Sequence, residues 1–131
     1  MNLITIKNHV SDSLFSLGFQ VRKATTINQD AAEYILVLNN FLETNENISM
    51  GNSAYSTLTF DIVCTSKDEQ TVQNTMDTIY NHVRDVEFQK SFAASDIHIS
   101  TVTVISIADD TDTTSGINTM MLTLQLNYIT R

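Results

Sequence analysis

The apolar side chains near the end of the chain recur at every second position, and this feature constrains the fold more than any other. They are Met120, Leu122, Leu124, Leu126 and Tyr128, and the polar residues Thr123, Gln125 and Asn127 stand between them. A period of two held over nine residues predicts a β-strand with one buried and one solvated face. A strand this regular must pair within its own sheet or with another subunit, because an exposed edge invites pairing.

Length and composition predict a single soluble domain over residues 1–131. The chain is 42% apolar and 17% charged, and it has one cysteine, Cys64. This size supports one ordinary core, and the apolar content is too high for a disordered chain. No apolar run is long enough for a membrane span and no signal peptide opens the chain, so we expect synthesis in the cytoplasm and no membrane partner. Cys64 lies in a strand-like run and is expected to be a small buried residue.

The charge balance is acidic, with 15 Asp and Glu against 7 Lys and Arg and a net charge of -8. The largest basic cluster is the pair Arg22-Lys23. Tight binding of nucleic acid needs several phosphate contacts, and this chain lacks the cations for them. An acidic surface remains compatible with DNA that slides past without being held.

Three elements are predicted in the first half of the chain. Apolar residues at three- and four-residue steps predict an amphipathic helix over residues 3–17, which Gly18 can end in a left-handed conformation. The apolar run 34–38 predicts a strand buried on both faces, which Phe41 and Leu42 could extend. Alternation over residues 57–64 predicts a second strand.

The second half contains another helix and two strands. Ser66 and Glu69 form the pattern of a capping box, and an apolar stripe from Val72 to Val83 follows, so a helix is predicted over residues 67–86. Phe88 and Phe92 are expected to pack under its end. Residues 97–107 predict a strand in which the apolar parity switches, which indicates either a β-bulge or a strand that passes from one environment to another.

The predicted order is helix, strand, strand, helix, strand, strand. This order favours an α+β fold in which both helices pack on one face of an antiparallel or mixed sheet.

The sequence offers no strong signal for catalysis, a metal or a cofactor. His9, His82 and His98 are far apart in the chain, and the three glycines are separate and cannot form a phosphate loop. The acidic run Asp109, Asp110 and Asp112 fails the EF-hand pattern, because Ser115 stands where glycine is needed and Met121 where a bidentate Glu is needed. We therefore expect a protein that is not an enzyme.

Two polar segments, residues 43–53 and 108–116, are predicted to be long loops. They could be plain hairpin tips, or they could contact other subunits or line a channel. The candidate residues for the second role are Glu43, Glu46, Asp109, Asp110 and Asp112.

The order of these elements resembles the tail terminator (tail completion) proteins of long-tailed bacteriophages. The resemblance extends from the helix at Leu3–Leu17, through the strands at 34–38 and 58–64 and the helix at 72–83, to the final Leu124-Gln-Leu-Asn-Tyr128. One departure is that residues 30–33 lack the proline that such proteins often have before the first strand. Related head–tail connector proteins share the same outline.

The resemblance implies a homo-oligomeric ring, usually a hexamer, at the head–tail junction of the virion. Such a ring caps the tail tube, stops its polymerisation and presents a docking surface to the head-side connector or stopper protein, while DNA passes through the lumen. On this view the polar face of the last strand, Thr123, Gln125 and Asn127, is a candidate interface. Another connector or neck protein of the head–tail joint is the first alternative, a small-ligand-binding or enzymatic α+β domain is the second, and a nucleic-acid-binding module is the third.

Overall fold

The computed structural model describes residues 2–19, 21–22, 35–47, 54–109, 114 and 116–130. These residues form one five-stranded sheet with helices. In chain order the elements are α1 (Asn2–Ser16), β1 (Val21–Arg22), β2 (Ile35–Asn47), β3 (Ala54–Ser66), α2 (Glu69–Val83), α3 (Val86–Ser91), the 3₁₀ helix η2 (Phe92–Ser95), β4 (His98–Asp109) and β5 (Asn118–Thr130).

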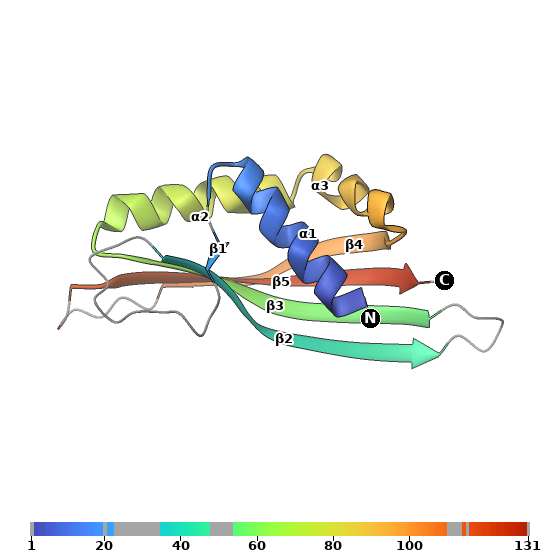
Figure 1. Ribbon diagram of the computed structural model, residues 1–131. Coiled ribbons are helices and arrows are strands. Elements are labelled where there is room, and N and C mark those ends of the chain that lie inside the picture. Colours follow the sequence, from blue (N-terminus) through green and yellow to red (C-terminus); the bar gives the residue numbers. More distant parts are fainter. Residues whose placement is uncertain are drawn as a thin grey trace.

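The strand order in the sheet is β1-β2-β3-β5-β4. The four long strands pair antiparallel, and the two-residue strand β1 pairs parallel to β2. Helices α1, α2 and α3 all lie on one side of the sheet (Figure 1). The α+β class is therefore confirmed, whereas the predicted order was incomplete, because it lacked β1 and the short helices α3 and η2.

The last strand, β5, lies inside the sheet. It pairs with β3 from Ala54↔Thr130 to Ser66↔Asn118 and with β4 from His98↔Ile129 to Asp109↔Met120. Both of its backbone edges are thus occupied within its own chain. A ladder between β5 and a neighbouring subunit is therefore excluded, and only its side chains are available for a contact.

The core lies between the helices and one face of the sheet. On β5 this face carries Leu122, Leu124, Leu126 and Tyr128, which are all 0% exposed, as the alternation predicted. Helices α1 and α2 each add an apolar stripe to this core, and α3 adds Phe88. The other core residues include Ile6, Val10 and Leu14 of α1, Leu58, Phe60, Ile62 and Cys64 of β3, and Val72, Met76, Ile79 and Val83 of α2.

The helix ends follow local chemistry, with one correction. Gly18 has φ +95°, and the amide of Phe19 donates to the carbonyl of Leu14, so α1 ends as expected. The N-cap of α2 is Asp68, whose carboxylate accepts from the amide of Gln70. The capping box at Ser66 was wrong because β3 continues through Ser66, which instead accepts from the amide of Asp68.

Bulges interrupt two of the strands. In β4 the register shifts between Ile99 and Thr101 and again between Val104 and Ser106, which confirms the predicted irregularity. In β2 it shifts between Asn39 and Leu42, where Asn40 has a left-handed φ of 57°. Each extra residue moves the following side chains to the other face of the sheet.

Phe88 and Phe92 pack under the end of α2, as expected, and are 2% and 0% exposed. They lie on α3 and at the start of η2. Their rings meet edge to face, with centroids 5.3 Å apart. None of the described helices has the length and apolar character needed to cross a membrane.

Candidate functional site

The side of the sheet opposite the helices, called the uncovered face below, has no described helix over it (Figure 1). Asn127 of β5 is central to its hydrogen bonding. Its Oδ1 accepts from Thr57 of β3 at 2.8 Å, and its Nδ2 donates to Thr101 of β4 at 2.6 Å. This amide therefore ties three strands together through uncharged hydroxyl and amide groups.

Asp61 places a carboxylate on the same face, where it is fully engaged. It is 9% exposed and accepts from Thr123 Oγ1 and from Asn40 Nδ2, each at 2.7 Å. The β-bulge at Asn40 brings that amide to the carboxylate. Charge-assisted hydrogen bonds of this kind satisfy a buried anion without a cation. Two of the three candidate interface residues, Thr123 and Asn127, are thus held by internal hydrogen bonds.

Glu43 belongs to a strand and not to a loop. Because β2 continues to Asn47, the prediction of a loop beginning at residue 43 was wrong for Glu43 and Glu46. Glu43 accepts a hydrogen bond from the hydroxyl of the buried Tyr128. Burial, with the Glu43 carboxylate beside it, holds the pKa of Tyr128 well above its usual range. The Glu43 side chain therefore lies on the helix side of the sheet.

The remaining acidic candidates are not brought together by the described structure. Glu46 lies near the end of β2, and Asp109 is the last residue of β4, so the prediction of a loop beginning at residue 108 was wrong for Asp109. Asp110 and Asp112 lie outside the described residues. Among the residues that are described, no three His, Cys, Asp or Glu side chains are grouped so that they could hold a metal ion.

Both ends of the sheet have open edges among the described residues. β4 pairs with β5 alone, and β2 pairs with β1 only at Leu36 and Val37. At the start of β4, Gln89 Nε2 donates to the carbonyls of Ile99 and Ser100, at 2.9 and 3.2 Å. The Gln89 side chain therefore occupies the beginning of the outer β4 edge. The rest of that edge has no strand neighbour among the described residues.

Exposed apolar side chains mark these two edge strands. Ile105 and Ile107 of β4 are 53% and 44% exposed, and Leu42 of β2 is 64% exposed. The other large apolar residues in this group, Ile4, Phe15 and Val86, lie on helices. On the sheet, exposed apolar surface therefore occurs on the edge strands and not on the interior strands β3 and β5.

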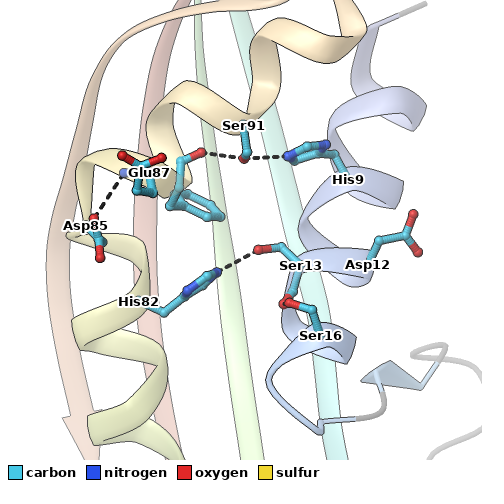
Figure 2. Close-up of a pocket in the computed structure, with 9 residues that line it drawn as sticks. His9, Asp12, Ser13, Ser16, His82, Asp85, Glu87 and Ser91 are labelled. Atoms are coloured by element: carbon cyan, nitrogen blue, oxygen red, sulfur yellow. Dashed lines mark hydrogen bonds between the residues drawn. The ribbon is translucent and has the colours of Figure 1, made fainter.

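A cleft of about 380 Å³ lies between α1 and the α2–α3 segment (Figure 2). His82 Nε2 and Ser13 Oγ are 2.6 Å apart, and His9 Nε2 and Ser91 Oγ are 2.8 Å apart. Because Ser91 gives its own proton to the carbonyl of Phe88, it must accept from His9, which places a proton on His9 Nε2. The two histidines, which lie 73 positions apart in the sequence, thus face one cleft from different helices.

The electrostatics of the cleft favour neutral imidazoles. Burial lowers the pKa of both His9 and His82, and the nearby carboxylates of Asp12 and Asp85 partly oppose this shift. Asp85 also accepts from the amide of Glu87, so it caps α3. Sequence reasoning missed this grouping. The only signal was that His9 and His82 each stand next to a core residue, Val10 and Val83, and so border the buried stripes of their helices.

No protein-family model matches this chain, and neither does any curated protein.

Proposed function

We propose that this chain is a structural protein of a long-tailed bacteriophage, a tail terminator that forms a homo-oligomeric ring, most simply a hexamer. The ring caps the tail tube, stops its polymerisation and offers a docking surface to the head-side connector or stopper protein. Another connector protein of the head–tail neck is the nearest alternative. On this proposal the protein is made in the host cytoplasm, acts in the virion and performs no enzymatic reaction.

The observation that carries the proposal is the absence of cationic side chains from the four long strands of the sheet. None of the strands β2, β3, β4 and β5 contains a lysine or an arginine. The uncovered face carries hydrogen-bonded Thr and Asn side chains, and its Asp61 carboxylate is engaged by internal donors. A surface without cations does not hold phosphates, so DNA can pass it without being trapped.

Electron microscopy of the purified protein, alone and with tail tubes of the phage that encodes it, tests this proposal. We expect rings, and one ring at the end of each capped tube, with tubes no longer extending when tube protein is added. Protein that neither forms rings nor binds tube ends would falsify the proposal.

A paired variant tests the role of the uncovered face. Thr103→Lys with Gln125→Lys places cations on neighbouring positions of β4 and β5, which are paired in the register. If this face lines the lumen, rings of the variant should bind DNA at low salt and lose it as salt rises. The matched control is Asp77→Lys on the exposed side of α2, which should leave DNA binding unchanged.

The cleft between α1 and α2 favours one second candidate function, binding of a small ligand. Its volume lies in the range of ligand sites, and it combines the Phe88 ring with two imidazoles and several hydroxyls. A thermal-shift screen would support this candidate if a compound gave saturable stabilisation that His82→Gln abolished.

A further inference from the structure

We propose that the two open edges of the sheet are the two halves of one repeating contact between copies of this chain. The outer edge of β4, residues 101–109, pairs with the outer half of β2, residues 39–47, of the next copy. This inference deepens the proposed function, since it rests on the ring and states how the ring is joined.

The β4 edge is suited to accept a strand. It belongs to a 12-residue strand that has one strand neighbour among the described residues. Exposed edges in soluble proteins are commonly blocked by lysine, by proline, by a β-bulge or by a covering segment. β4 contains neither lysine nor proline, and Gln89 covers only its beginning. β4 does carry a bulge at Val104–Ser106, and Ile105 within it is 53% exposed, which adds apolar surface beside the edge.

The β2 edge is its counterpart at the opposite end of the sheet. The short strand β1 covers β2 only at Leu36 and Val37, so the part of β2 after the bulge has no described strand on its outer side. This part likewise contains no lysine, arginine or proline. Glu43 turns its carboxylate to Tyr128, while Leu42 is 64% exposed.

A second copy of this chain is the occupant that these observations favour. One sheet offers two different open edges, and each is flanked by exposed aliphatic side chains, so each copy carries both parts of the contact. Joining unlike edges repeats the same rotation from copy to copy, and such a head-to-tail contact gives a closed ring when that rotation closes. Joining like edges would stop at a dimer with twofold symmetry. A continuous sheet gives main-chain hydrogen bonds across each junction, as in β-augmentation.

Two edge variants and their mixture test the contact. The β4 variant is Ile105→Lys with Ile107→Lys, and the β2 variant is Leu42→Lys with Thr44→Lys. All four positions are exposed, so folding should be retained, and circular dichroism with thermal unfolding checks this. The control variant, Phe15→Lys, places a cation at a residue of α1 that is 70% exposed. Light scattering then reports the mass of the particles, with electron microscopy on tail tubes as a second readout.

We expect each edge variant alone to be monomeric, with assembly weakened by at least about tenfold because lysine blocks edge pairing. An equimolar mixture should form a one-to-one heterodimer and nothing larger, because each variant keeps one intact and different edge. The Phe15→Lys control should assemble like the wild type.

Three outcomes overturn the inference. They are rings formed by either edge variant, a β2 variant that dimerises on its own through its intact β4 edges, and a wild type that stays monomeric both in solution and on tubes. If edge variants still form rings that cap tubes, the edge contact fails while the proposed function stands. If the wild type assembles through these edges but never binds tubes, the edge contact stands and the proposed function fails.

Discussion

The hydroxyl of Tyr128 donates a hydrogen bond to the carboxylate of Glu43, a residue 85 positions earlier in the chain. The tyrosine ring is 0% exposed and belongs to the core, whereas its hydroxyl reaches β2. The last strand and the first long strand are not neighbours in the sheet, because β3 lies between them. This side-chain bond therefore links two strands across a third.

Replacing Tyr128 by Phe should destabilise the protein by about 1–3 kcal/mol, since it leaves a partly buried carboxylate with one donor fewer. Urea unfolding monitored by circular dichroism measures the effect. The control is Glu43→Gln, whose side-chain carbonyl can still accept from the tyrosine, so its loss should be smaller. Equal stability of Tyr128→Phe and the wild type would contradict the importance of this bond.

Asp61 and Thr123 should be energetically coupled. In Asp61→Asn, one carboxylate oxygen becomes an NH₂ group, which cannot accept the hydrogen bond that Asn40 or Thr123 now donates to that oxygen. The expected loss in the free energy of unfolding is about 1–3 kcal/mol. Thr123→Val removes one donor and should cost about 1 kcal/mol. A double-mutant cycle from urea unfolding should give a coupling of at least about 0.5 kcal/mol. Simple additivity of the two losses would show that the pair does not interact.

Stability should fall as the pH is lowered through the range in which histidine titrates. The pKa values of His9 and His82 are lowered by burial, so at such pH the unfolded chain binds more protons than the folded protein. The contribution of these neutral histidines is thus fully present above the ordinary value of 6.5 and declines as pH falls from there toward their folded pKa values. Urea unfolding at a series of pH values measures this slope. His9→Gln with His82→Gln should flatten it, and an unchanged slope in that variant would assign the effect to other groups.

The two faces of β5 should respond differently to truncation. Leu124→Ala removes a fully buried side chain and should cost about 2–5 kcal/mol. Gln125 is the next residue and lies on the uncovered face. The free energy of unfolding of Gln125→Ala should stay within about 0.5 kcal/mol of the wild-type value, and its main effect should be on ring assembly or on the surface of the lumen. Thermal unfolding and light scattering on the same samples separate the two effects. A larger loss of stability for Gln125→Ala than for Leu124→Ala would reverse the assignment of the faces.

The helices and strands that show a local apolar period were predicted correctly from the sequence. The alternation in residues 120–128 located β5 and its buried face, and the parity switch in residues 97–107 located the bulges of β4. The predicted helix at residues 3–17 agrees with α1 to within one residue. In each case the residues of a single element are enough to predict which of its faces is buried.

The errors occurred where structure depends on residues far apart in the chain. Glu43 and Glu46 are polar, so composition favoured a loop, but pairing with β3 extends β2 through both residues. The six-residue helix α3 is too short to show a helical period. The approach of His9 to Ser91 and of Ser13 to His82 follows from the packing of α1 against α2 and α3, which no local pattern records.

The interior position of β5 has a consequence for how the chain folds during synthesis. β5 is the last strand in chain order, yet it separates β3 from β4 in the sheet. While the ribosome is still making residues 118–130, β3 and β4 both have a long unpaired side, and the core lacks its fully buried Leu and Tyr residues. The sheet can therefore be completed only when β5 inserts between two strands that are already made. Nascent chains that stop short of β5 should be the species that chaperones retain.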